Sequence, residues 1–117
     1  MLIDRANTQW SIDFINVVVN APHGLERIEE FLSNKIIFHR LYDGDPYKIY
    51  TYEDMMWDNP DQNICKKNEI VLSIDFVGYE EEIQVLTYDQ LKEFVIMVLR
   101  EKPNGDEQIN EFIKRVT

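Results

Sequence analysis

Few side chains in this sequence could carry acid–base or nucleophilic chemistry. The only histidines are His23 and His39, and the only cysteine is Cys65. They are therefore the only neutral-pH imidazole bases and the only thiol nucleophile in the chain. His23 lies in a predicted turn, His39 lies in an apolar segment, and no nucleophile motif surrounds Cys65. We interpret all three as structural residues.

Two groups of acids could serve as ligands or catalysts. Asp43-Gly44-Asp45 has closely spaced carboxylates, which suit a hard divalent cation, but the later ligands of a calcium loop are missing. Glu80-Glu81-Glu82 is expected in an exposed hairpin turn, where it is better placed to contact a partner than to catalyse. The four glycines are far apart, so no phosphate-binding loop is present. The sequence therefore predicts no enzyme, no cofactor and no bound metal.

Negative charge is concentrated in the middle of the chain. The sequence has 22 acids and 12 lysines or arginines, a formal net charge of −10. Residues 43–82 contain 11 of the acids and 3 of the bases, a net charge of −8. Such a surface repels phosphate backbones and anionic membranes and attracts basic proteins. We therefore expect a protein partner, with no direct binding to nucleic acid or membrane.

The acidic segment is also rich in tyrosine and tryptophan. It holds five of the eight Tyr and Trp residues. These side chains are favoured anchors in protein interfaces because each has an apolar body and a polar tip. An alternative interpretation is a solvated acidic face whose aromatic rings serve the core. The candidate partner-binding residues are Glu53, Asp54, Trp57, Asp58, Asp75, Tyr79, Glu80 and Glu81.

Length and composition indicate one folded domain over residues 1–117. Leu, Ile, Val and Phe together make up 37 of the 117 residues, enough for a core. The sequence has no apolar run long enough to span a bilayer, and residues 1–5 have no basic region followed by an apolar stretch, so we expect no signal peptide. A single cysteine fits a reducing compartment. We expect a cytoplasmic protein.

Hydrophobic spacing predicts two helices in the first third of the chain. Residues 12–20 form the first, with Ser11 as its N-cap, and residues 24–34 form the second. The apolar run at 36–41 is interpreted as a short strand, and Asp43–Pro46 as a turn. Residues 47–52 alternate weakly and are interpreted as an edge strand. Residues 54–68 contain Asn59-Pro60 and many polar residues, and are interpreted as mostly loop.

The second half has clearer signals. Residues 69–77 and 82–86 read as two strands of an antiparallel hairpin. Thr87-Tyr88-Asp89-Gln90 has the form of a capping box before a long helix, and Asp106 is expected to cap a final helix. The predicted fold is α+β: an N-terminal helical hairpin and two C-terminal helices packed on a small antiparallel sheet. The residues expected to form the helix–sheet core are Leu91, Phe94, Val95, Val98, Ile109, Phe112, Ile113, Ile70, Leu72, Ile74 and Phe76.

Several motifs in this chain are similar to those of a known family. The C-terminal ones are Glu69-Ile70-Val71-Leu72-Ser73-Ile74-Asp75-Phe76, Tyr79-Glu80-Glu81-Glu82-Ile83, Leu86-Thr87-Tyr88-Asp89-Gln90-Leu91, Lys102-Pro103 and Ile109-Asn110-Glu111-Phe112-Ile113. The N-terminal ones are Phe14-Ile15-Asn16, Leu25-Glu26 and Phe31-Leu32. Together they resemble the bacterial immunity proteins of contact-dependent growth inhibition, in the group paired with ribonuclease toxins. The likeness covers about two-thirds of the chain and leaves residues 36–66 unmatched.

The resemblance implies a cytoplasmic inhibitor without a cofactor. Such a protein binds the basic nuclease domain at the C-terminus of a large exoprotein, as a 1:1 heterodimer, and blocks its activity. Two other functions stay open: a cytosolic adaptor for some other basic protein, and a small metal-dependent hydrolase using Asp43, Asp45 and His39. The family supplies no contact residues, so the candidate residues come from the charge and aromatic argument alone.

Overall fold

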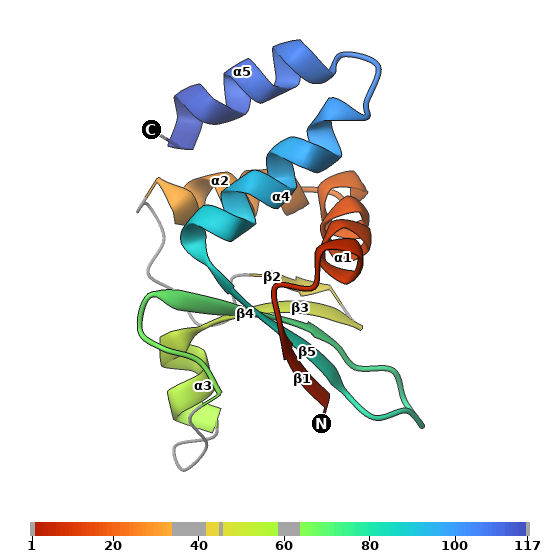
Figure 1. Cartoon of the computed structure of the whole chain (residues 1–117), viewed down its shortest axis with the longest axis vertical. Helices are drawn as coiled ribbons and strands as arrows, with labels where there is room; N and C mark the ends of the chain where they lie inside the picture. Colours follow the sequence, from red (N-terminus) through yellow and green to blue (C-terminus); the bar gives the residue numbers. More distant parts are fainter. Residues whose placement is uncertain (1, 34–41, 45, 59–63, 117) are drawn as a thin grey trace.

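A five-stranded mixed sheet forms the middle of the protein (Figure 1). The computed structural model describes residues 2–33, 42–44, 46–58 and 64–116. The strand order is β1-β5-β4-β3-β2. The bounds are β1 Leu2–Arg5, β2 Tyr42–Gly44, β3 Tyr47–Thr51, β4 Glu69–Ile74 and β5 Glu82–Thr87. Four of the strands pair antiparallel, as expected, but β1 pairs parallel with β5, so a purely antiparallel sheet is wrong.

The β4–β5 hairpin is confirmed, with one difference in length. Strand β4 ends at Ile74, not at residue 77 as its alternating pattern predicts. Ile70 pairs with Leu86 and Val71 with Val85, which places successive residues on opposite faces of the sheet. Beyond Ile74 the chain leaves the ladder and forms the projecting end of the hairpin (Figure 1).

Strand β3 lies inside the sheet and is not the edge strand that its weak alternation predicts. It pairs with β4 on one side and with β2 on the other. Within the predicted turn 43–46, residues 43 and 44 belong to β2, and Gly44 pairs with Tyr47. The strand predicted at 36–41 lies outside the described residues.

The two N-terminal helices are confirmed, but the first begins earlier than predicted. Helix α1 spans Thr8–Asn20, and Asn7 is its N-cap, because the Asn7 side chain accepts a hydrogen bond from the Trp10 amide. Ser11, the predicted cap, is buried inside the helix. Helix α2 spans Gly24–Leu32.

The C-terminal helices form two successive layers. Helix α4 spans Tyr88–Arg100 and starts with the predicted capping box between Thr87 and Gln90. Helix α5 spans Gly105–Val116, so Asp106 lies in its first turn and not at its cap. Figure 1 shows α5 stacked on the far side of α4 and α2 from the sheet. Among the helices of the described residues, none is long and apolar enough to cross a membrane.

Both faces of the sheet carry buried apolar side chains. On one face, Ile49, Ile70, Leu72 and Leu86 join a core with α1, α2, α4 and α5. On the other face, helix α3 (Tyr52–Asp58) and the segment at Ile64 and Cys65 cover a smaller cluster with Val71, Ile83 and Val85. The α+β class is therefore confirmed, whereas the loop predicted at 54–58 is wrong.

Four residues of the expected helix–sheet core are not fully buried. Ile113 on α5 is 42% exposed, because α5 turns Phe112 and Val116 inward instead. Phe76, which follows the end of β4, is 48% exposed. Ile74 and Ile109 pack against the core and are only partly buried. The other seven positions belong to the buried core.

Candidate protein-binding surface

The end of the β4–β5 hairpin carries an exposed apolar group, which we call the tip patch: Phe76, Val77 and Tyr79. Val77 is 100% exposed and Tyr79 is 79% exposed. Apolar side chains that gather at one exposed place are typical of protein-binding surfaces, whereas single ones are common everywhere. The tip patch therefore is a candidate interaction site.

A tight turn gives the tip its shape. The Tyr79 amide donates a hydrogen bond to the Phe76 carbonyl at 3.1 Å, and Gly78 between them has a φ of 88°. That backbone region favours glycine, because at positive φ a Cβ atom crowds the carbonyl oxygen of the preceding residue. The turn leaves Val77 and Tyr79 exposed beyond the end of β4.

An unbroken series of aromatic contacts joins the tip patch to the core. Phe76 meets the Tyr47 ring edge to face at a centroid distance of 6.3 Å, and Tyr47 meets Phe14 in the same way at 5.4 Å. Phe14 in turn stacks on Trp10 at 5.4 Å. Such ring pairs add stability beyond the area they bury. The base of the tip is therefore fixed to helix α1 and strand β3.

Acidic side chains surround the tip patch. Asp75, Glu80 and Glu82 are exposed. The Asp75 backbone amide donates to the Pro46 carbonyl at 3.1 Å, which holds this residue against the β2–β3 turn. Glu81 is half-buried, and its carboxylate accepts a 2.6 Å hydrogen bond from the hydroxyl of buried Ser73. Glu81 therefore has a role inside the fold as well as a place beside the patch.

The other predicted residues lie on helix α3. Trp57 is 80% exposed, Glu53 is also exposed, and Asp58 ends the helix. Asp54 is only 3% exposed, so its assignment to a partner surface is wrong. The Asp54 carboxylate accepts a hydrogen bond from the Thr51 amide at 3.0 Å, and the Asp54 amide donates one to the Thr51 hydroxyl. These two reciprocal hydrogen bonds cap the N-terminus of α3.

The two groups of predicted residues do not form one patch. Helix α3 follows β3 directly, beside the start of β4, whereas the tip follows the end of β4. The six residues of β4 separate them by roughly 17 Å at the usual rise of a strand. Charge and composition along the chain could not distinguish these two places, because both depend only on the order of residues in the sequence.

Some exposed residues near the tip escaped the sequence analysis. Phe76 and Val77 were assigned to strand faces by alternation, so their exposure beyond the end of the ladder was not expected. Gly78 marks the turn but not the end of the ladder, which lies four residues earlier at Ile74, so the sequence held no signal for their exposure. Leu2 and Ile3, both about half exposed on β1, had no signal at all, because no element was predicted there.

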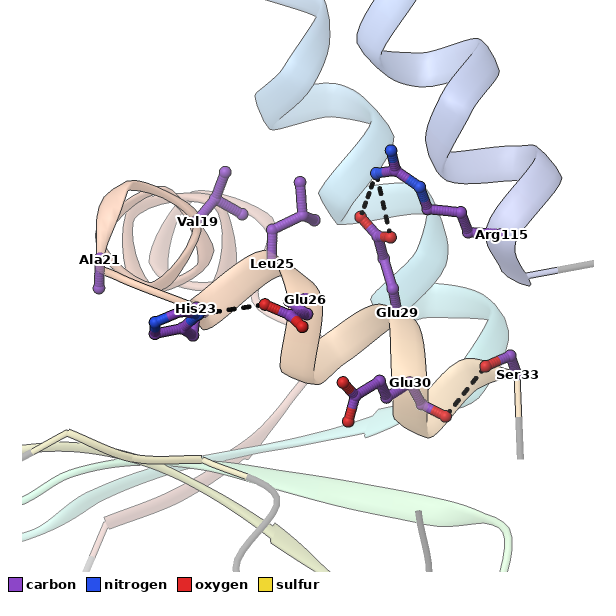
Figure 2. Close-up of a pocket in the computed structure, with 10 residues that line it drawn as sticks. Val19, Ala21, His23, Leu25, Glu26, Glu29, Glu30, Ser33 and Arg115 are labelled. Carbon is purple, nitrogen blue, oxygen red and sulfur yellow. Dashed lines mark hydrogen bonds and ion pairs between the residues drawn. The ribbon is translucent and has the colours of Figure 1, made fainter. Parts of the chain in front are cut away.

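A separate hollow of about 610 Å³ lies beside helix α2 (Figure 2). His23, with a positive φ of 62°, places its ring nitrogen Nδ1 3.1 Å from Glu26 Oε2. Deeper in, both carboxylate oxygens of buried Glu29 lie 3.3 Å from Nη1 of Arg115. Both pairs join residues that line the hollow: the first lies within the start of α2, and the second ties α2 to α5. We therefore assign both a structural role.

The buried thiol of Cys65 has low reactivity at neutral pH. Burial raises the pKa of Cys65 to about 11, and the nearby carboxylate of Glu69 contributes in the same direction. Thiolate is the reactive form of cysteine, so little of it exists at neutral pH. This agrees with the structural role inferred from the sequence.

The described residues contain no group of three or more His, Cys, Asp or Glu side chains close enough to hold a metal ion. The metal-dependent alternative used Asp43, Asp45 and His39. Asp43 lies on β2, and the other two lie outside the described residues.

No protein-family model matches this chain, and comparisons with curated proteins and with solved structures find no match.

Proposed function

We propose that this protein is an immunity protein that binds a basic ribonuclease toxin and neutralises it in a 1:1 complex. The observation that carries the proposal is the tip patch, where exposed Phe76, Val77 and Tyr79 are bordered by Asp75, Glu80 and Glu82. Nucleases that grip RNA present basic surfaces. An apolar patch within an acidic border has the complementary chemistry.

The two components of this surface act on different steps of binding. The acidic border, within a chain of net charge −10, attracts a basic partner and speeds encounter, an effect that salt weakens. The apolar tip supplies contacts that lose water on binding and so slow dissociation. Inhibition of this kind is stoichiometric and needs no cofactor.

The test uses the basic C-terminal domain of an exoprotein encoded beside the gene for this chain. The two proteins are mixed in equal amounts, and complex formation and RNA cleavage are measured at several salt concentrations. We expect a 1:1 complex, loss of cleavage, and an association rate that falls as salt rises. A basic domain that neither binds nor loses activity would contradict the proposal.

Charge reversal then locates the surface. One variant reverses Asp75, Glu80 and Glu82 at the tip, a second reverses Glu53 on α3, and a control reverses exposed Glu93 and Glu101 on and after α4. We expect only the tip variant to bind the toxin domain more weakly and to show an association rate that depends less on salt. If the control variant loses affinity for the toxin domain and the tip variant does not, the interface lies on the C-terminal helices.

The adaptor alternative differs only in the partner. A stable complex with a basic protein that has no nuclease activity, together with no effect on the neighbouring toxin domain, would favour an adaptor over an immunity protein.

A further inference from the structure

A small hollow lies at the open edge of the sheet, next to the tip patch. It measures about 260 Å³, and strands β1 and β5 and the start of helix α1 line it. Leu2 pairs with Glu82 and Asp4 with Gln84 along the parallel ladder. Side chains alternate between faces, and Leu86 points into the helix-covered core, so Glu82 and Gln84 share that face. The amide of Asn7 donates a hydrogen bond to Gln84 Oε1 at 2.9 Å, which joins the start of α1 to β5 within the lining of the hollow.

The lining combines two carboxylates with an aromatic ring and an aliphatic side chain. Asp4 and Glu82 lie on neighbouring strands, and Trp10 and Leu2 provide apolar surface. Trp10 stacks on Phe14 with an interplanar angle of 11°, which fixes the indole plane. Asp4 Oδ1 accepts from the Arg5 amide at 2.7 Å, so this carboxylate is held in place as well.

These groups match the chemistry of an arginine side chain. A guanidinium binds carboxylates through several N–H groups in one plane, and it packs on aromatic rings. Its aliphatic stem can cover a residue such as Leu2. The hollow's volume is below the roughly 300–1,000 Å³ of pockets that take drug-sized ligands, which suits a single side chain.

Arg5, which is adjacent in sequence to Asp4 of the hollow, is paired elsewhere. Arg5 follows Asp4 on β1, so its side chain points to the opposite face, where it pairs with Glu69. The hollow also adjoins the tip, because the Leu2 amide donates to the Glu81 carbonyl at 2.8 Å. A partner that covers the tip patch can therefore reach the hollow.

We propose that this hollow receives one arginine side chain of the basic partner protein. The proposal rests on the proposed function, and it specifies that the partner has an arginine at the position that faces the hollow. The complementary charge of Asp4 and Glu82 selects a cation, and the indole beside them favours a planar one.

A capped arginine, Nα-acetylarginine N-methylamide, tests the hollow without the partner. It is titrated into the isotope-labelled full chain, and the backbone amides of Leu2 and Glu82 and the indole N–H of Trp10 are followed by NMR. We expect saturable shifts at these three positions. The citrulline analogue, of similar shape but neutral, should bind at least tenfold more weakly, and the lysine analogue should also bind more weakly.

Variants separate specific binding from attraction to an acidic protein. The double variant Asp4→Asn and Glu82→Gln keeps side-chain size and should weaken arginine binding at least tenfold. The control variant Glu93→Gln and Glu101→Gln removes the same charge from exposed positions far along the chain and should leave binding unchanged. The assignment is wrong if both variants weaken binding of the capped arginine equally. It is also wrong if the citrulline or the lysine analogue binds as tightly as the arginine analogue.

The same double variant distinguishes this proposal from the proposed function. If the toxin domain binds and is sensitive to tip variants, but the Asp4→Asn and Glu82→Gln protein binds it within twofold of wild type, the hollow is not the anchor and the immunity function stands. If capped arginine binds as expected while no basic nuclease domain binds, the hollow is an arginine site and the immunity function is wrong.

Discussion

Arg5 on β1 and Glu69 at the start of β4 form an ion pair across the intervening strand β5, with Arg5 Nη1 2.5 Å from Glu69 Oε2. The Glu69 side chain is buried, and its other oxygen, Oε1, accepts from the Lys66 amide at 2.7 Å. The hydrogen bond from Arg5 holds the pKa of Glu69 below its ordinary value, against the opposing effect of burial. This pair therefore fastens the edge strand β1 to the centre of the sheet.

We predict that Glu69→Gln lowers the free energy of unfolding by about 1–2 kcal/mol at pH 7, because it removes a charged hydrogen-bond acceptor whose partner is half exposed. The folded pKa of Glu69 is below the ordinary 4.5, so the unfolded state binds the proton more readily. The stabilisation is complete above pH 4.5 and is lost as the pH falls through the lower, folded pKa. Urea unfolding at a series of pH values measures it.

The control for this prediction is Glu93→Gln, an exposed acid on α4. Its stability should follow wild type at every pH. If the difference in unfolding free energy between wild type and Glu69→Gln stays constant as the pH falls well below 4.5, the ion pair does not lower the pKa of Glu69 as described.

Local signals explain which elements could be predicted from the sequence. The capping box at Thr87 and Gln90 and the alternation of residues 70–74 are short-range patterns, and both elements are confirmed. Helix α3 has a similar signal, Thr51 followed by Asp54, but Asn59-Pro60 and the polar residues beyond it favoured a loop. Here the local cap, not the composition of the wider window, decides the structure.

Strand β1 could not be predicted in this way. Its four residues include Asp4 and Arg5, and its pairing partner β5 lies some 80 positions away in the sequence. The strand is held by the parallel ladder and by Glu69, neither of which is visible locally. The division of the acidic and aromatic surface into two places was not visible locally either. Composition shows which residues are present, but only the end of the ladder at Ile74 separates the tip from α3.

Variants of the tip patch should change binding and not stability. For Val77→Ser combined with Tyr79→Ser, we predict an unfolding free energy within about 0.5 kcal/mol of wild type, since both side chains are exposed. Affinity for the toxin domain should fall by about 2 kcal/mol, roughly 30-fold, because interface anchors are lost. Calorimetric titration measures the affinity and denaturant melts measure the stability.

A matched control replaces Met97 and Ile113 by serine, since both are apolar, partly exposed and located on α4 and α5. This control should bind the toxin domain as wild type does. Equal loss of affinity in the two double variants would show that the toxin does not recognise the tip patch in particular.

Helix α2 depends on the absence of a side chain at Gly24. A Cβ atom there would lie 1.8 Å from the carbonyl oxygen of Val18 on α1, so backbone would have to move. We predict that Gly24→Ala lowers the unfolding free energy by about 3 kcal/mol or more, despite the better helix propensity of alanine, which offers at most about 1 kcal/mol. Thermal and urea unfolding both report this loss.

Gly78→Ala is the contrasting variant. Its Cβ would meet nothing within 4 Å, but its φ of 88° is strained for alanine, so a loss of about 1 kcal/mol is expected. If Gly24→Ala costs no more than Gly78→Ala, helices α1 and α2 do not approach as closely as described.

The reactivity of Cys65 tests the packing of the face covered by α3. The thiol lies among Met55, Val71 and Val85, and burial raises its pKa from 9.0 to about 11. At pH 8 this lowers the thiolate fraction by about 100-fold relative to an ordinary cysteine. We predict that the native protein reacts with a disulfide reagent at least 100-fold more slowly than the protein unfolded in guanidinium. The native rate should keep rising about tenfold per pH unit through pH 9, where an ordinary thiol begins to level off.

Glu69→Gln provides the internal check on the cause of this shift. The Glu69 carboxylate contributes to the raised pKa of Cys65, after burial, so removing its charge should make the native thiol react modestly faster at pH 8. The Glu53→Gln variant removes a smaller contribution of the same sign and should have a weaker effect. A native thiol that reacts as fast as the unfolded one would mean that the segment at Ile64 and Cys65 does not cover Val71 and Val85, because a thiol packed against them is shielded from both water and reagent.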